Sequence, residues 1–195
     1  KVVRPENTKK VTEETMDALK AKGHNPFFIP VGGSIPLDAA SYMNAILELM
    51  YQAVEKGIKL DYLVHATGSG GTQAGLVMGT KAFNTGIKII GAATGSRSRE
   101  EQINNISKLI EESLDFLQLD LKIGKEDIIV YDQYAGGGYG FMTEGKAKAI
   151  KLVAQTEGLF IDPVYTGTAI ACLIDLCRQG FFKPDDVVVF LHTGG

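Results

Sequence analysis

A glycine-rich turn between an apolar strand and an apolar helix constrains the fold of this chain more than any other feature. The segment covers residues 63–75 and reads LVHATGSGGTQAG. Glycines permit positive φ angles and close approach of a ligand, and the free N–H groups and dipole at the start of a helix attract an anion. We therefore expect a small phosphate group here, held by backbone amides and by the hydroxyls of Ser69 and Thr72. The alternative is a strand-to-helix turn without a ligand.

The spacing of the residues in this turn indicates which phosphate-containing ligands are disfavoured. A P-loop requires a Gly-Lys-Ser/Thr ending, but Gln73 follows Thr72, so no lysine is present for a triphosphate. The dinucleotide fingerprint requires a third glycine where Gln73 stands, and the next predicted strand ends in residues 91–93, GAA, without an acid for a ribose. ATP, GTP and NAD are therefore disfavoured as ligands.

The bulk properties fit one globular domain. The chain has 195 residues, is 45% hydrophobic, and carries a formal net charge of −3 with a pI of about 5.7. This charge favours neither nucleic acid nor a membrane as a partner. No apolar run approaches the ~18 residues of a membrane span, and the polar opening lacks the core of a signal peptide, so we expect a cytoplasmic protein. Cys172 and Cys177 are expected to be reduced and buried.

Predicted helices and strands alternate along the sequence. Apolar periodicity and turn residues predict helices over residues 11–22, 36–56, 71–83, 99–117, 144–156 and 168–179, and strands over residues 26–31, 60–66, 87–93, 128–131, 159–161 and 187–191. This alternation predicts an α/β fold, with an open, mostly parallel sheet and helices on both faces. Ligands bind such sheets beyond the carboxyl ends of the strands, so we expect the site in the loops that follow the strands.

Aromatic and hydroxyl side chains occur in these loops. Tyr139 and Tyr165 can each stack on a ring or transfer a proton, or can cap the core. Thr166 and Thr193 can bond a ligand heteroatom, or can be ordinary turn residues. The three histidines lack the spacing of metal ligands, so no metal site is predicted.

Four segments together resemble one enzyme family. The segments ATGSGGTQAG at 66–75, DPVYTG at 162–167 and HTGG at 192–195, with IPVGGS at 29–34, resemble the pyridoxal-phosphate enzymes of the D-cysteine desulfhydrase and 1-aminocyclopropane-1-carboxylate (ACC) deaminase family. The resemblance covers nearly the whole chain. It implies the large domain of fold type II, similar to the tryptophan synthase β subunit. It also implies pyridoxal 5′-phosphate as cofactor, a small amino-acid substrate and a homodimer.

The resemblance implies roles for individual residues. The residues that would hold the cofactor phosphate are Gly68, Ser69, Gly70, Gly71 and Thr72. Tyr165 would be a catalytic and substrate-binding residue against the pyridine ring, and Tyr139 matches a second catalytic tyrosine. Thr166 would bind the cofactor where deaminases carry a glutamate beside the pyridine nitrogen. Thr193 would contact the substrate where deaminases carry a leucine.

Both threonines match the desulfhydrase pattern. A carboxylate beside the ring nitrogen would favour the pyridinium and make the cofactor a strong electron sink, whereas Thr166 is neutral. A strong electron sink matters more for opening a cyclopropane ring than for releasing hydrosulfide. The resemblance thus implies a lyase that removes the α-proton of D-cysteine and expels sulfide, giving pyruvate and ammonia. The alternatives are an ACC deaminase, a sulfo-lyase, and a non-catalytic phosphate-ligand-binding protein.

One feature of the family is absent from these 195 residues. The resemblance implies a Schiff-base lysine in an N-terminal Ser/Gly-x-Gly-Asn-Lys segment, followed by a Ser-Asn loop, and neither segment occurs here. Each lysine in the chain is expected on a solvated surface. We therefore expect that an N-terminal part is missing and that the fragment is inactive alone. Residues 1–23 would be the tail of the small domain, and residues 24–195 the large cofactor domain.

Overall fold

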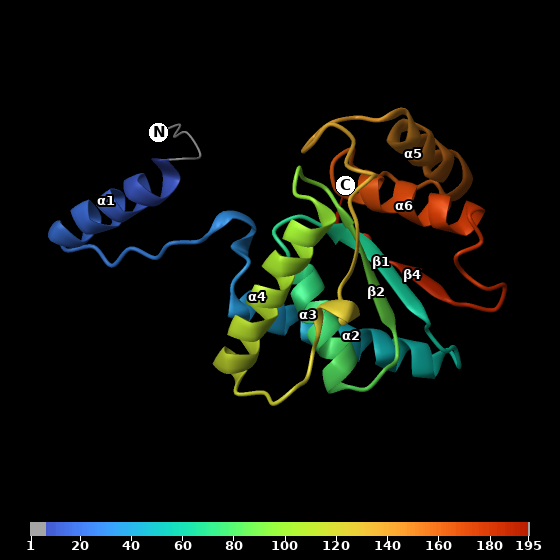
Figure 1. The fold of residues 1–195 in the computed structure, drawn as a ribbon, viewed down its shortest axis with the longest axis horizontal. Helices are drawn as coiled ribbons and strands as arrows, with labels where there is room; N and C mark the ends of the chain where they lie inside the picture. Colours follow the sequence, from blue (N-terminus) through green and yellow to red (C-terminus); the bar gives the residue numbers. More distant parts are fainter. Residues whose placement is uncertain (1–6, 195) are drawn as a thin grey trace. The chain divides into compact units, whose positions relative to one another are not determined.

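The structure, a computed structural model, describes residues 7–194 and contains two compact units (Figure 1). The first unit is Lys1–Gly33, and the second is Ser34–Gly195. The elements of the first unit are helix α1 (Thr8–Ala21) and the 3-10 turn η2 (Val31–Gly33). All described strands belong to the second unit. The division into small and large domains at residues 23 and 24 stays a prediction.

A four-stranded parallel sheet forms the centre of the second unit. Its strands are β1 (Tyr62–Thr67), β2 (Lys88–Ala93), β3 (Ile129–Tyr131) and β4 (Val188–Phe190), in the spatial order β3-β2-β1-β4. In the ladder, Tyr62 pairs with both Lys88 and Val188. The chain runs outward from β1 through β2 to β3, and then returns to the other side of β1. The strand order therefore reverses between β1 and β4, and such a switch point is where open α/β sheets bind ligands.

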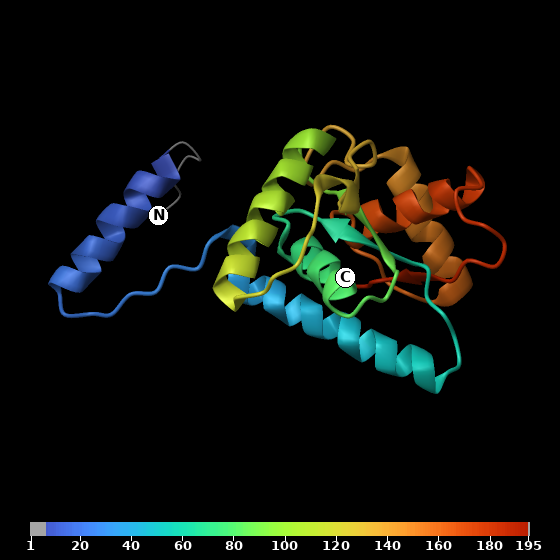
Figure 2. The same cartoon turned by 60° about the horizontal axis from the view of Figure 1, so that its bottom comes forward.

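Helices cover both faces of this sheet (Figures 1 and 2). One layer contains α2 (Pro36–Glu55), α3 (Gly71–Ala82) and α4 (Arg99–Leu117), and the other contains α5 (Glu144–Glu157) and α6 (Thr166–Arg178), with the turn η3 (Lys125–Asp127) before β3. Neighbouring residues of β1 pack against opposite helix layers: Leu63 packs with α2–α4, and Val64 packs with α6. The predicted α/β fold with an open parallel sheet is confirmed. None of the helices within residues 7–194 has the length and hydropathy that a membrane-spanning segment requires.

The strand predicted over residues 26–31 was wrong. Pro26 and Pro30 have no N–H to donate to a strand ladder, so they weaken this segment as a strand. Residues 24–30 are irregular, and Gly32, with φ of 77°, turns the chain in η2.

The strand predicted over residues 159–161 was also wrong. Leu159 and Phe160 are 50% and 87% exposed. The carbonyl of Phe160 accepts a hydrogen bond from the His192 side chain (2.9 Å) and has no partner in a ladder. A short apolar run becomes a strand only where another strand pairs with it.

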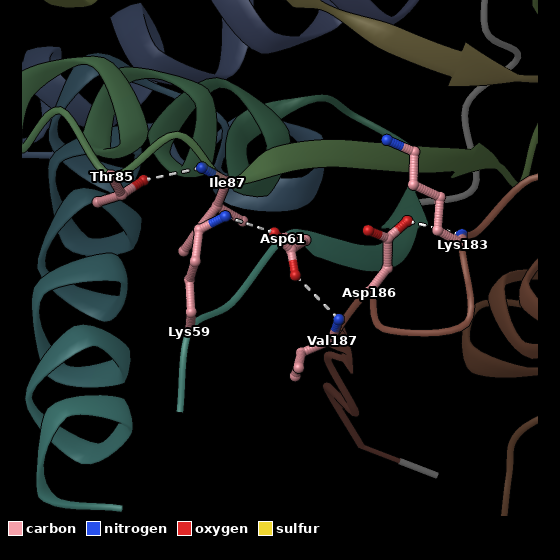
Figure 3. A network of polar contacts seen from close by, with 7 residues as sticks. All are labelled: Lys59, Asp61, Thr85, Ile87, Lys183, Asp186 and Val187. Carbon is pink, nitrogen blue, oxygen red and sulfur yellow. Dashed lines mark hydrogen bonds and ion pairs between the residues drawn. The ribbon is translucent and has the colours of Figure 1, made fainter. Parts of the chain in front are cut away.

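Polar contacts join the segments that precede β1 and β4, at the edge of the sheet where the strands begin (Figure 3). Asp61, just before β1, accepts the N–H of Val187 at Oδ2 (3.0 Å) and the ammonium of Lys59 at Oδ1 (2.9 Å). These hydrogen bonds, the one from Val187 first, lower the pKa of the Asp61 carboxyl. Asp186 accepts the N–H of Lys183 (2.8 Å) in the turn that leads into β4. The loops that follow the strands leave the sheet at the opposite, carboxyl edge.

Candidate active site

The turn between β1 and α3 leaves several amides without a protein partner. Gly70, just before α3, has φ of 103° in the left-handed region. The N–H of Gly71 donates to Ser34 Oγ (3.2 Å). Over residues 7–194, no protein group accepts a hydrogen bond from the amides of Ser69, Gly70, Thr72 and Gln73. Free amides at the positive end of a helix dipole form an anion-binding site.

Side chains of α4 and of the residue before its cap hold the carbonyl groups of this turn. Gln102 donates to the carbonyl of Gly68 (3.0 Å), and Asn105 donates to the carbonyl of Ser69 (2.7 Å). The guanidinium of Arg97 also donates to the Gly68 carbonyl (3.1 Å). The turn is thus fixed through its carbonyls, and its amides are left for a ligand.

The turn approaches its neighbours closely at Gly70 and Gly71, where there is no side chain. A Cβ on Gly70 would lie 2.9 Å from Nδ2 of Asn105 and 3.1 Å from Cγ1 of Ile106. A Cβ on Gly71 would overlap the carboxyl of Asp38, whose pKa is raised by burial. No side chain fits at Gly70 or Gly71, and such a cradle with free amides suits a phosphate group.

Two predicted site residues meet from separate loops. The phenol oxygens of Tyr139 and Tyr165 are 2.6 Å apart, and their rings meet edge to face with centroids 5.8 Å apart. The hydrogen bond with Tyr139, followed by burial, raises the pKa of Tyr165. The ring of Tyr165 also reaches the glycine turn, since a Cβ on Gly68 would lie 3.7 Å from its Cε1.

Asp162 organises the turn that carries Tyr165. Its carboxylate accepts the N–H groups of Val164 (2.8 Å), Tyr165 (2.7 Å) and Thr166 (2.6 Å), and also the Thr166 hydroxyl. Burial opposes ionisation of this carboxyl, but the bonds from Thr166 and the amides outweigh burial and lower the pKa of Asp162. Because these amides are satisfied, α6 begins at Thr166, two residues before its predicted start.

The last motif lies beyond the end of β4. The hydroxyl oxygen of Thr166 is 3.4 Å from the carbonyl oxygen of Gly194, so the loops before α6 and after β4 meet. Thr193 is exposed, and its hydroxyl makes no hydrogen bond to any residue of the described range. Gly195 and Lys1 lie outside the described residues. The functional roles of Thr166, Thr193, the two tyrosines and the glycine turn stay predictions.

Lys146 is the residue of this region that the sequence interpretation missed. The expectation of a solvated surface was wrong for it, because its side chain is 1% exposed. Its ammonium donates to the carbonyls of Phe141 (2.8 Å) and Ala135 (3.2 Å). One signal was present in the sequence, since Lys146 shares its helical face with the buried Ala149 and Val153.

Comparison with known proteins identifies the family. The family model described as pyridoxal-phosphate dependent enzyme matches residues 1–194. The chain belongs to this family. A D-cysteine desulfhydrase of Klebsiella pneumoniae subsp. pneumoniae is 39% identical over 183 residues, which cover 94% of this chain and 54% of the relative. A Pyrococcus abyssi protein provisionally named ACC deaminase is 37% identical over 186 residues, which cover 95% of this chain and 54% of the relative.

The solved structures agree with this assignment. The crystal structure of an ACC deaminase homologue superposes with a TM-score of 0.86 at 34% identity, covering 99% of this chain and 56% of that chain. A pyridoxal 5′-phosphate-dependent aspartate racemase shares the fold, with a TM-score of 0.56 at 18% identity over 91% of this chain and 55% of its own. The resemblance to the D-cysteine desulfhydrase and ACC deaminase family is confirmed, and the chain spans about half the length of the curated relatives it matches.

Proposed function

We propose that the glycine turn between β1 and α3 holds the phosphate of pyridoxal 5′-phosphate. The free amides of the turn, the dipole of α3 and the lack of room for side chains support this assignment. Ser34 and Ser69 add hydroxyls at the same place, because Ser34 Oγ donates to Ser69 Oγ (2.6 Å). When bound, the cofactor supplies an electron sink for negative charge on the substrate α-carbon.

The tyrosine pair is the second part of the proposal. Tyr139 and Tyr165 share one hydrogen bond, so one phenol donates while the other accepts. The raised pKa of Tyr165 keeps its phenol protonated at neutral pH, which suits a group that donates a proton to a departing thiolate. The ring of Tyr165 lies beside the proposed phosphate turn, because a Cβ on Gly68 would be 3.7 Å from its Cε1.

For the complete gene product we propose D-cysteine as the substrate, with conversion of D-cysteine and water into hydrogen sulfide, pyruvate and ammonia. The observation that carries this choice is the neutral hydroxyl of Thr166 where the resemblance expects a glutamate in deaminases. Thr166 is fully buried and bonded to Asp162, so the threonine belongs to an ordered part of the site. Thr193, in place of a leucine, supports the same choice. We also propose a homodimer, as the resemblance implies, and a cytoplasmic location, as the sequence analysis predicts.

The test is a parallel assay of three substrates. The complete gene product, loaded with pyridoxal phosphate, is supplied with D-cysteine, L-cysteine or ACC, and sulfide and keto-acid release are measured. We expect sulfide and pyruvate from D-cysteine, and the double substitution Thr166→Glu with Thr193→Leu should shift activity toward ACC. Ammonia release from ACC by the unmodified protein would favour the deaminase, as the name of the Pyrococcus relative suggests. No turnover and no cofactor binding would favour the non-catalytic alternative.

A further inference from the structure

The loop that carries Tyr139 is rich in glycine and needs support to hold one conformation. It covers residues 135–141, AGGGYGF. Three of its residues have positive φ angles, Gly136 at 72°, Gly138 at 130° and Gly140 at 77°. Glycines lose more conformational freedom on ordering than other residues, so an ordered loop of this composition requires specific contacts.

Lys146 supplies such contacts at both ends of this loop. Its ammonium donates to the carbonyl of Ala135 at the start (3.2 Å) and to the carbonyl of Phe141 at the end (2.8 Å). Tyr139 lies between these two points and is 66% exposed. The ends of the loop are therefore held together by one buried cation, while the tyrosine projects outward to its partner.

The ammonium of Lys146 also interacts electrostatically with Asp162, the carboxylate that organises the turn of Tyr165. Burial lowers the pKa of Lys146, and the charge of Asp162 opposes this effect. Asp162 holds the turn of Tyr165 through its amide bonds. One buried cation and one carboxylate thus support the two loops whose phenols meet.

We propose that Lys146 is a positioning residue that keeps the phenol of Tyr139 on the phenol of Tyr165. The consequence for catalysis rests on the proposed function of the two tyrosines, whereas the positioning itself does not. Lys146 is not available as a nucleophile, because it is buried and its ammonium is bonded to two carbonyls.

The test compares Lys146→Met with Lys148→Met in the complete gene product. Both substitutions remove a lysine from α5, but Lys148 is exposed, and among the described residues it pairs only with Glu144 (2.6 Å). Tyrosines labelled with ¹³C at Cζ are titrated by NMR, and Tyr165→Phe assigns the resonance. In Lys146→Met the pKa of Tyr165 should fall toward its ordinary value, as it should in Tyr139→Phe. Lys148→Met should leave this pKa unchanged.

A double substitution tests whether Lys146 acts through Tyr139. Lys146→Met combined with Tyr139→Phe should lower the pKa of Tyr165 no further than Tyr139→Phe alone. An unchanged Tyr165 titration in folded Lys146→Met, or an added shift in the double variant, would overturn the proposal. Where Lys146→Met does not stay folded, Lys146→Gln replaces it, because glutamine keeps a donor for one carbonyl. The pKa of Tyr165 should then fall by part of the full shift, and an unchanged pKa would overturn the proposal.

Turnover separates this inference from the proposed function. Misplacing a catalytic group by about 1 Å lowers turnover by ~10²-fold, so kcat for sulfide release should fall to that extent in Lys146→Met, with a smaller change in KM. The loss should not add to that of Tyr139→Phe. A Tyr165 shift with unchanged turnover in both variants would support the positioning role and would refute the catalytic role of the tyrosines.

Discussion

Two glycine-rich loops leave the same edge of the sheet, one after β1 and one after β3, and the protein stabilises them differently. In the first loop, α4 side chains hold the carbonyls, and Gly70 has neighbours at 2.9 and 3.1 Å from its missing Cβ. In the second loop, a buried ammonium holds the two end carbonyls. Gly136 at its start is as crowded as Gly70, since a Cβ there would overlap Cγ2 of Thr143, but Gly140 beside Tyr139 has nothing within 4 Å of its missing Cβ. Glycines of the first loop make room for backbone amides to face a ligand. Glycines of the second loop turn the chain so that a tyrosine is presented.

Alanine substitutions should give the largest difference in unfolding free energy between the two loops. Gly70→Ala combines a left-handed φ of 103° with a clash against Asn105 and Ile106. We expect a loss of roughly 2–5 kcal/mol, the sum of backbone strain and overpacking. Gly140→Ala has a φ of 77° but open space, so strain alone should cost about 1 kcal/mol. Urea denaturation of both variants measures the difference, and equal losses would contradict the distinction between the loops.

Acid should weaken the strand that leads into the first loop. His65 in β1 is fully buried, and burial lowers its pKa from 6.5 to about 4. The unfolded chain binds this proton when the pH falls to the ordinary pKa of 6.5, whereas the folded protein binds it only near the lowered pKa of about 4. The contribution to stability is therefore present above pH ~6.5 and is lost as pH falls through ~4, a loss of ~3 kcal/mol.

The control for this effect is a variant without the buried imidazole. The free energy of unfolding is measured from pH 8 to pH 4 for the unmodified chain, for His65→Gln and for His24→Gln at the exposed histidine. The pH-dependent loss should shrink in His65→Gln only. Parallel pH profiles for all three proteins would exclude His65 as the source.

Asn105→Leu should loosen the first loop without affecting the second. The substitution leaves the Ser69 carbonyl without its donor at 2.7 Å, which should cost about 1–3 kcal/mol in unfolding free energy. Sulfate binding, measured by calorimetry, should weaken with it. The matched control is Asn104→Leu, because Asn104 is exposed and its side chain accepts a single hydrogen bond within residues 7–194, from Lys125 (2.6 Å). Weaker sulfate binding in the control alone would contradict the role given to Asn105.

Asp38→Asn should have the smallest effect. Burial raises the pKa of Asp38, so its protonated form favours the folded state, and this contribution is lost as pH rises through the folded pKa. Once ionised, the carboxylate next to Gly71 repels an anion on the turn. Sulfate keeps its charge in this titration, so its affinity should fall as pH rises through the raised pKa of Asp38 in the unmodified chain. In Asp38→Asn the affinity should stay flat, with a few-fold gain at pH 8, corresponding to about 1 kcal/mol or less. Identical affinity profiles would show that Asp38 does not act on the turn.

Local sequence signals were enough to predict the elements whose capping residues and apolar spacing lie within a few residues of one another. Helix α4 runs from Arg99 to Leu117, as predicted, because Ser98 and Glu101 form a capping box and the apolar spacing continues to the end. The glycine turn before α3 was equally readable, since the strand, the glycines and the helix are contiguous. The alternation of these elements was sufficient to predict a parallel sheet.

Strand pairing and side-chain burial depended on contacts between segments that are distant in the sequence. Residues 159–161 are apolar, but they lack a neighbouring strand, so they form none. The contact between Tyr139 and Tyr165 joins loops 26 residues apart, and Lys146 is buried because the loop above it supplies two carbonyls. Hydrogen bonds within a helix or turn depend on local sequence, whereas pairing and burial depend on what distant segments bring to the same place.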